Sequence, residues 1–284
     1  MSKKIKILLA VLVFWVALFI SWEWWHSFPK HVFKPTLKVT SKKEGIDSIL
    51  NQAMSTYLLP GISLAIVENG KVSYLNAFGY ENLATKDSMT VESQIPVASL
   101  SKLFVALGVA TALEGKGVLS SDSFRLLELG EKVNSSSIAN LRFQDLLTHQ
   151  SGIRDKNISE RIFSFSNSRH LNEWGVGFLE NGTKYQSDSI TYTYADSNYD
   201  LLGFLLSQYE NLDFDSVIQR NVLSPSGMVN SNFITTWPIE GIDITGYQKT
   251  FLWKRLEPKR IRFPILPSPS SGMLTTTKDI SIAL

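Results

Sequence analysis

The sequence predicts an α+β domain at residues 43–284, which follows a membrane segment at residues 1–25 and a linker at residues 26–42. Three observations carry this prediction: an uncharged N-terminal run, a helix followed by a β-hairpin, and a nearly all-apolar segment at residues 99–113. Strands in one part of the chain and helices in another are typical of α+β folds.

The N-terminus has the pattern of a membrane anchor. Lys3, Lys4 and Lys6 precede an uncharged run at residues 7–22 that ends in clustered tryptophans. A positive flank, an apolar core and interfacial Trp residues are typical of a helix whose N-terminus is cytoplasmic. The run is short for a spanning helix, which needs about 20 apolar residues, and a signal peptide is the alternative. No small-x-small cleavage site follows Ile20, so we expect an uncleaved inner-membrane anchor with a periplasmic domain; a cleaved signal would make the domain secreted.

Composition excludes several classes of function. Lys plus Arg number 28 against 26 Asp plus Glu, and without the N-terminal lysines no basic surplus remains, so no nucleic-acid partner is expected. The chain has no Cys, and its four His form no His-Glu-x-x-His. We therefore expect no metal and no cofactor, and a hydrolase of this composition must use Ser, Thr, Asp, Glu, Lys or Tyr.

The folded part opens with a helix and a hairpin. Apolar residues at helical spacing predict a helix at residues 43–57. Residues 62–67 and 72–78 are β-rich and flank Asn69 and Gly70, a strong signal for a type I′ turn because that turn needs positive φ twice. Helices are also expected at residues 99–113, 143–147, 199–209 and from 275 onward, with long extended connections at residues 229–271.

Ser99 and Lys102 form a Ser-x-x-Lys motif at the start of the apolar helix, which we expect to be buried on all sides. Positions i and i+3 share one helix face, and a helix N-terminus favours a developing anion. Burial would lower the pKa of Lys102 and make it a base, so the motif indicates a serine activated without His. A Lys102 that reaches the surface is the structural alternative. A second Ser-x-x-Lys at residues 27–30 shows that the motif alone is weak.

Together with further segments, this motif resembles the β-lactamase-related serine hydrolases. The segments, in the family's order, are residues 97–102 (VASLSK), 146–153 (LLTHQSGI), 194–203 (YADSNYDLLG), 225–228 (PSGM) and 271–274 (SGML). That family includes class C β-lactamases, D-Ala-D-Ala carboxypeptidases and transpeptidases of the penicillin-binding-protein type, and related esterases. The resemblance implies an α/β sandwich half and a mostly helical half.

The resemblance also implies a mechanism and a substrate class. Ser99 would attack a carbonyl and form an acyl-enzyme, Lys102 would hydrogen-bond to it, and Tyr194 would carry the proton. The backbone N–H of Ser99 would supply one oxyanion donor, and His149 would be structural. The expected substrates are small β-lactams, esters or D-amino-acid peptides such as those of peptidoglycan.

Two departures from the family pattern matter. Asp196 stands at a substrate-binding position where the family usually has Asn, and an ionised Asp196 near Lys102 would favour the ammonium. The third motif, Lys-Thr-Gly or His-x-Gly, is absent; residues 249–251 (KTF) lack the Gly and precede residues 271–274. We therefore expect a C-terminally truncated domain that lacks sheet strands, the terminal helix and the second oxyanion donor. An inactive, membrane-anchored paralogue that binds peptidoglycan is the alternative function.

Overall fold

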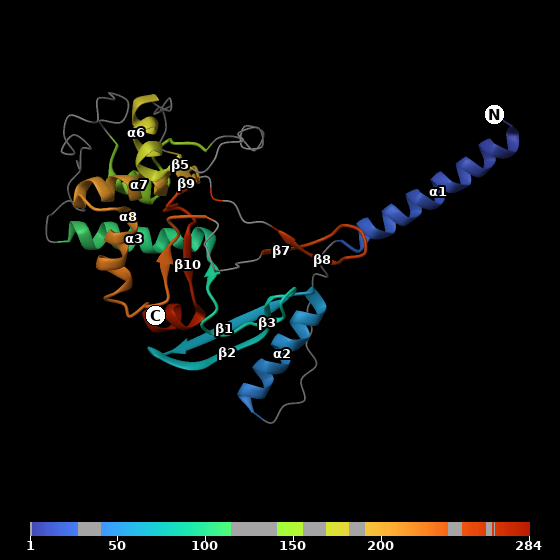
Figure 1. Cartoon of the computed structure of the whole chain (residues 1–284), viewed down its shortest axis with the longest axis horizontal. Coiled ribbons are helices and arrows are strands. Elements are labelled where there is room, and N and C mark those ends of the chain that lie inside the picture. The colour runs from blue at the N-terminus through green and yellow to red at the C-terminus, as the bar shows by residue number, and fades with distance from the viewer. Residues whose placement is uncertain are drawn as a thin grey trace. The chain divides into compact units, whose positions relative to one another are not determined.

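The structure is a computed structural model of the whole chain (Figure 1). It describes residues 2–27, 41–114, 141–155, 169–181, 191–237, 246–259, 263 and 265–284. Most of the expected linker, residues 28–40, lies outside the described residues.

The chain divides into two compact units. The first unit comprises Met1–Ser63, Ala77–Thr90 and Ile244–Ile261. The second unit comprises Leu64–Asn76, Val91–Asp243 and Arg262–Leu284. The division passes through the first hairpin of the chain, which therefore contributes residues to both units.

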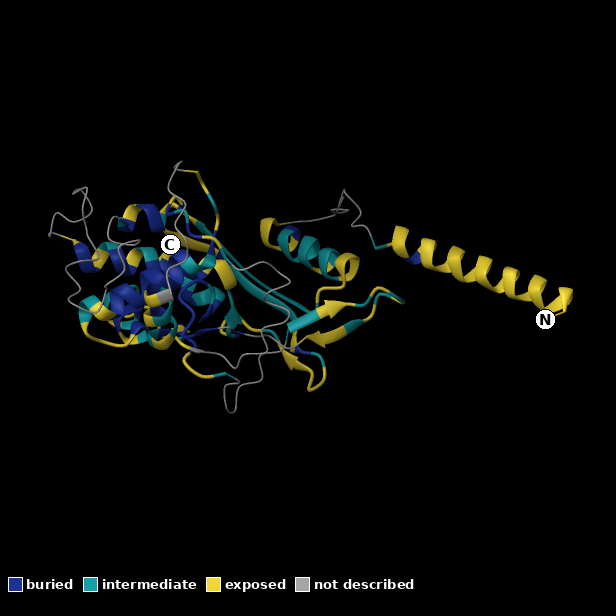
Figure 2. Cartoon of the chain, turned by 90° about the horizontal axis from the view of Figure 1, so that it is seen from above, coloured by how far each residue is buried: buried dark blue, intermediate teal, exposed yellow. Residues whose placement is uncertain are grey.

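The first unit begins with a long apolar helix, α1 (Lys3–Trp25). Its side chains are exposed almost throughout, and Glu23 is its one buried residue among those described (Figure 2). Its 23 residues, at 1.5 Å each, span about 34 Å, against about 30 Å for the hydrocarbon core of a bilayer. The helix is thus long and apolar enough to cross a membrane, although an N-terminal signal sequence has the same properties.

A second, amphipathic helix follows, α2 (Lys42–Tyr57). Ser41 caps its N-terminus, because the Ser41 hydroxyl accepts a hydrogen bond from the backbone N–H of Glu44 at 3.2 Å. Leu58 ends the helix in the left-handed conformation, with φ of 54°. The helix predicted from apolar spacing is therefore present, with the predicted C-terminal residue.

The predicted β-hairpin is present as β1 (Gly61–Glu68) and β2 (Lys71–Asn82), and β3 (Asp87–Ser88) extends the sheet in the order β1-β2-β3. Asn69 and Gly70 have φ of 53° and 68°. A type I′ turn requires positive φ at both central residues, which explains why Asn-Gly occurs here.

A second hairpin lies where the sequence predicted only extended connections. β7 (Gly246–Lys249) and β8 (Leu256–Lys259) pair in antiparallel register. The Tyr247 hydroxyl accepts a hydrogen bond from the backbone N–H of Leu83 at 2.7 Å, so the base of this hairpin is attached to the end of β2 within the first unit.

Helices dominate the second unit, and α7 lies at their centre. In the part of this unit that the structure describes, the helices are α3 (Ser101–Leu113), α4 (Phe143–Leu147), α6 (Leu171–Asn181), α7 (Asp196–Glu210), α8 (Phe214–Ile218), the π-helical turn η3 (Gln219–Leu223) and α9 (Thr277–Ala283), with the 3₁₀ turn η1 (Ala98–Leu100) before α3. α7 packs against α3, α4, α6 and α8, and its residues 198–207 are all buried. The core of the unit is therefore mainly an interface between helices.

Short strands connect this helical core to the Ser-x-x-Lys segment. β10 (Met273–Thr275) lies between β4 (Ile95–Pro96) and β6 (Asn232–Phe233), antiparallel to both. A parallel pair, β5 (Arg169–His170) with β9 (Ile265–Leu266), forms a separate small sheet. Because β4 closely precedes Ser99, its pairing with β10 fixes where the Ser-x-x-Lys segment enters its helix.

The expectation that the helix after Ser99 is buried on all sides is wrong. Leu100, Leu103 and Leu107 are 45%, 51% and 45% exposed, and they share one face at helical spacing. The opposite face, with Val105 and Val109 fully buried, packs against α7 and η3. The apolar composition of this segment therefore did not show whether the helix is buried on one face or on all sides.

Replacing Leu205 with alanine is expected to destabilise the second unit. Leu205 is fully buried in α7, and removing a buried Leu side chain leaves a cavity that typically costs about 2–5 kcal/mol. Urea unfolding should show a lower midpoint with an unchanged slope. Leu212→Ala, at a 42% exposed position, is the matched control and should change stability by less than about 0.5 kcal/mol. Equal effects of the two substitutions would contradict the central place of α7.

Candidate active site

Ser99 lies in a short 3₁₀ turn, η1 (Ala98–Leu100), that leads directly into α3. The side of the turn facing β10 is held by two hydrogen bonds: the Val97 N–H donates to the Met273 carbonyl, and the Met273 N–H donates to the Ser101 hydroxyl, both at 3.1 Å. Ala98 has φ of 47°, a left-handed conformation that is unfavourable for a residue with a Cβ. This turn presents an exposed Ser99 at the start of a helix.

Lys102 is 7% exposed, and all three of its ammonium hydrogens have acceptors. Its Nζ donates to Oδ1 of Asp196 at 2.8 Å, to the carbonyl of Ser270 at 2.9 Å and to Oγ of Ser99 at 3.4 Å. Lys102 therefore does not reach the surface, and the structural alternative is wrong. A buried charge that is paired and fully hydrogen-bonded is compatible with a stable fold.

The pKa of Lys102 is raised, not lowered as its burial alone predicted. Burial is the largest single influence and lowers the pKa of the ammonium group. The carboxylate of Asp196 and the hydroxyl of Tyr194 together outweigh it, because both stabilise the charged form. The sequence-based prediction of a lowered pKa was wrong because Asp196, the partner that keeps Lys102 protonated, lies 94 residues away in the sequence.

Tyr194 lies directly beside this pair. Its hydroxyl donates a hydrogen bond to Oγ of Ser99 at 2.9 Å, and Nζ of Lys102 lies 5.0 Å from the centroid of its ring. Tyr194 is 49% exposed, so the Ser99–Tyr194 contact lies at the surface of the second unit while the ammonium lies beneath it. The structure thus brings together all four residues that the sequence singled out, Ser99, Lys102, Tyr194 and Asp196.

His149 supports Tyr194 and has a structural environment. Its Nδ1 accepts a hydrogen bond from the backbone N–H of Ala195 at 3.3 Å and lies 3.0 Å from Nδ2 of Asn198. Its ring lies 4.5 Å from the ring of Tyr194, measured between centroids. Burial, assisted by the charge of Lys102, lowers the pKa of His149 and so favours the neutral ring. The carbonyl of His149 also accepts a hydrogen bond from the backbone N–H of Thr193 at 2.8 Å, so His149 holds the backbone on both sides of Tyr194.

Asp155 positions Asp196, and sequence reasoning missed it. One of its carboxylate oxygens accepts from the backbone N–H of Asp196 at 2.8 Å; the other accepts from the N–H and the hydroxyl of Ser197 at 3.0 and 2.7 Å. A carboxylate at a helix N-terminus satisfies unpaired N–H groups and complements the helix dipole. No local pattern marks Asp155, because the helix it caps begins 41 residues later.

Asp200 lies beneath the site and was also missed. Its Oδ1 accepts a hydrogen bond from the N–H of Ser270 at 2.9 Å, while the carbonyl of the same Ser270 accepts from Lys102. Burial raises the pKa of Asp200 to about 7, although its hydrogen bonds to Ser270 act in the opposite direction. Asp200 and Lys102 therefore bind the backbone N–H and the carbonyl of the same residue, Ser270.

The buried Asp200 is expected to make stability depend on pH. Its pKa is about 7 in the folded chain against 3.8 for the free group, so between these values the folded state binds the extra proton. Its contribution is complete below pH 3.8 and is lost as the pH rises toward 7, at up to about 1.4 kcal/mol per pH unit. Asp200→Asn cannot titrate and should flatten this part of the profile. Urea unfolding from pH 4 to 8 measures the free energy of unfolding of the unsubstituted chain and of Asp200→Asn. The same pH dependence in both proteins would contradict the raised pKa of Asp200.

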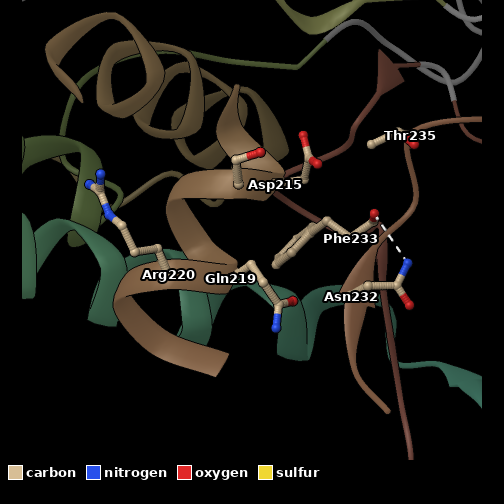
Figure 3. Close-up of a pocket in the computed structure, with 7 residues that line it drawn as sticks. Asp215, Gln219, Arg220, Asn232, Phe233 and Thr235 are labelled. Carbon is tan, nitrogen blue, oxygen red and sulfur yellow. Dashed lines mark hydrogen bonds between the residues drawn. The ribbon is translucent and has the colours of Figure 1, made fainter. Parts of the chain in front are cut away.

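A cavity elsewhere in the second unit takes no part in this site. It has a volume of about 420 Å³ and lies among α8, η3 and the segment around β6 (Figure 3). It is lined by Asp215, Ser216, Gln219, Arg220, Asn232, Phe233 and Thr235.

Among the residues that the structure describes, no group of three or more His, Cys, Asp or Glu side chains could hold a metal ion.

Comparisons with known proteins find relatives that are similar in sequence and solved structures that are similar in fold. "Protein flp" of Staphylococcus aureus (strain N315) is 25% identical over 249 residues, which cover 86% of this chain and 49% of that protein. A penicillin-binding protein homologue from Pyrococcus abyssi is similar in structure, with a TM-score of 0.66 and 24% identity over 85% of this chain and 55% of that one. A class C β-lactamase solved with cefoxitin has a TM-score of 0.65 and 21% identity, over 84% and 63%.

The two solved structures show the fold, which is that of the penicillin-binding proteins and class C β-lactamases. The chain spans about half the length of the curated relatives it matches. The family profile described as "Beta-lactamase" matches residues 46–284, which is most of the chain. By this match, and in agreement with the resemblance noted in its motifs, the chain belongs to the beta-lactamase family of serine hydrolases.

Proposed function

We propose that this protein is a serine hydrolase or acyltransferase that forms an acyl-enzyme on Ser99. The observation that carries the proposal is the position of Oγ of Ser99, which lies 2.9 Å from the Tyr194 hydroxyl and 3.4 Å from Nζ of Lys102. A nucleophile that contacts both a proton carrier and a cation is the arrangement that acyl transfer needs. The proposed substrates are β-lactams, D-amino-acid peptides and esters.

Proton transfer in this mechanism falls to Tyr194. Because Asp196 keeps Lys102 protonated, Lys102 cannot accept the proton of Ser99. We assign that step to a relay through the Tyr194 hydroxyl. Oγ bonds to the substrate carbonyl carbon and the bond from that carbon to the leaving group breaks; the Ser99 proton moves to the Tyr194 oxygen as the Tyr194 hydroxyl proton passes to the leaving group. The ammonium of Lys102 stabilises the negative charge that develops on Oγ. Water, deprotonated through Tyr194, then hydrolyses the acyl-enzyme and restores Ser99.

The oxyanion of the tetrahedral intermediate requires hydrogen-bond donors. The backbone N–H of Ser99, at the start of α3, is proposed as one of them. In the family a strand with Lys-Thr-Gly or His-x-Gly gives another, and neither motif occurs in these 284 residues.

Covalent labelling tests the proposal directly. The full chain is incubated with a fluorophosphonate or with a fluorescent penicillin, digested, and mapped by mass spectrometry. We expect one adduct per chain, on the peptide that contains Ser99. An unlabelled chain with a cooperative unfolding transition, or an adduct on a different serine, would overturn the proposal.

A second candidate is a non-enzymatic protein that binds peptidoglycan peptides at the same surface; the raised pKa of Lys102, which disfavours its action as a base, supports it. Calorimetric titration with a D-Ala-D-Ala peptide separates the two candidates. Binding without any covalent adduct on Ser99 supports the second candidate, and an adduct on Ser99 excludes it.

We further propose that α1 anchors the chain in the inner membrane, with the N-terminus in the cytoplasm and the domain on the extracytoplasmic side. The length of α1, its exposed apolar surface, the lysines at its N-terminal end and its C-terminal tryptophans support this placement. Retention in the membrane pellet after extraction at alkaline pH is the expected result.

A further inference from the structure

We infer that the tip of the second hairpin, residues 250–255 between β7 and β8, is a second membrane-binding element that enters the headgroup region of an anionic bilayer beside α1. The inference rests on the proposed membrane insertion of α1. It concerns the first unit only and is independent of the chemistry at Ser99.

The hairpin tip is attached to the C-terminal end of α1. Nζ of Lys254 donates to Oε2 and to the carbonyl of Glu23, at 2.8 and 2.9 Å, and to the hydroxyl of Ser27 at 2.8 Å. The Trp253 ring lies 6.4 Å from the ring of Phe19, between centroids. These contacts join segments more than 220 residues apart in sequence at the end of the helix that carries the tryptophans.

The side chains at the tip have the composition of an interfacial anchor. Trp253 is 65% exposed and Phe251 is 45% exposed, which is unusual for two large aromatic rings on one short loop. Basic side chains accompany them, since Cζ of Arg255 lies 5.9 Å from the Trp253 ring and Nζ of Lys254 lies 4.9 Å from the Phe251 ring. Aromatic rings with an apolar body and a polar edge concentrate at membrane interfaces, and an Arg side chain such as Arg255 extends toward anionic headgroups.

The depth of the tip follows from its contacts along α1. Trp22, Trp24 and Trp25 form an exposed aromatic belt at the end of the helix. Phe19 lies about one helical turn before Trp22, about 5 Å nearer the bilayer centre. Because Trp253 contacts Phe19, its ring would lie at the level of the belt or slightly below it. The ion pair with Lys254 also neutralises Glu23, the one acidic residue of α1.

The backbone of the hairpin tip has an unfavourable conformation that other contacts must stabilise. Trp253 and Lys254 both have left-handed φ, 59° and 48°, although neither is Gly or Asn. This conformation is unfavourable for residues with large side chains, and it persists only where other contacts compensate. The Glu23 contact is one such contact, and the bilayer is inferred to be the other. A two-stranded hairpin alone is marginal in water, so a partner surface at its tip would stabilise it.

Site-directed spin labelling of the full chain tests the inference, and the absence of cysteine makes each single-Cys variant label at one place. Labels are placed at Phe251→Cys on the tip, Phe14→Cys in the middle of α1 and Val229→Cys, an 80% exposed site in the second unit. The chain is reconstituted in vesicles of phosphatidylcholine with phosphatidylglycerol. Relative collision rates with oxygen, which enters lipid, and with a water-soluble nickel chelate are then measured.

We expect the oxygen-to-nickel ratio at Phe251→Cys to exceed that at Val229→Cys several-fold, as it should at Phe14→Cys. Adding Arg255→Glu to the Phe251→Cys variant should lower the ratio, since one basic residue changes partition to an anionic surface about fivefold. A water-like label at Phe251→Cys with a lipid-like label at Phe14→Cys overturns the inference and leaves the α1 anchor standing. Water-like labels at Phe251→Cys and at Phe14→Cys overturn both the inference and the proposed α1 anchor. A tip label shielded from both reagents would mean protein contact, such as a second copy of the chain, and also overturns it.

Discussion

Replacing Ser99 with alanine is expected to abolish covalent labelling by fluorophosphonates and penicillins and to lower any acyl-transfer rate about 10⁶-fold, the order seen when a catalytic serine is removed. Ala lacks the oxygen that contacts Tyr194 and Lys102, so no acyl-enzyme can form. The side chain is exposed on the surface of a short turn, and the fold should tolerate its loss. Gel fluorescence and intact-mass spectrometry measure the labelling, and urea unfolding verifies the fold.

The chain contains its own matched control for this experiment. Ser27 opens the other Ser-x-x-Lys string, yet it lies in the first unit, where its hydroxyl donates to the carbonyl of Glu23 and accepts from Lys254. Ser27→Ala should therefore label as well as the unsubstituted chain. Undiminished labelling of Ser99→Ala would reject the assigned nucleophile, whatever the activity of the chain.

Replacing Asp196 with asparagine is expected to move the pH dependence of Ser99 labelling toward lower pH. The introduced amide carries no charge, so Lys102 would lose the carboxylate that raises its pKa, while burial would continue to lower it. Each unit of pKa reduction increases the fraction of free amine about tenfold at a pH below the pKa, and free amine can accept the proton of Ser99. The rate of phosphonylation between pH 6 and 10 measures the shift.

Asp213→Asn provides the control for this substitution, because it removes a charge from an exposed position in the same unit. It should leave the pH profile unchanged. An unchanged profile for Asp196→Asn as well would show that the Asp196–Lys102 ion pair has no part in activating Ser99. Loss of labelling at every pH, with the fold intact, would show instead that the protonated Lys102 is required.

Local signals predicted the elements that local physics determines. The Asn69-Gly70 turn was predictable because few residues adopt positive φ easily, and both residues have that conformation in the structure. The helix at residues 43–57 was predictable from its apolar spacing and from its C-terminal end, and the helix predicted at residues 143–147 is also present. The short helices α6 and α8 and the hairpin β7-β8 were not, because packing against the rest of the chain decides whether such weakly patterned segments become ordered.

The sequence by itself determined the residue types of the candidate site: Ser99 and Lys102 one turn apart, with Tyr194 and Asp196 indicated by resemblance. Tertiary structure alone decided the charge state of the site. Asp196 reaches Lys102 across 94 residues, Asp155 fixes the start of the helix that carries Asp196, and Asp200 binds the segment that receives Lys102. Electrostatic interactions depend on distance and burial, and neither follows from sequence spacing when the partners lie on different elements.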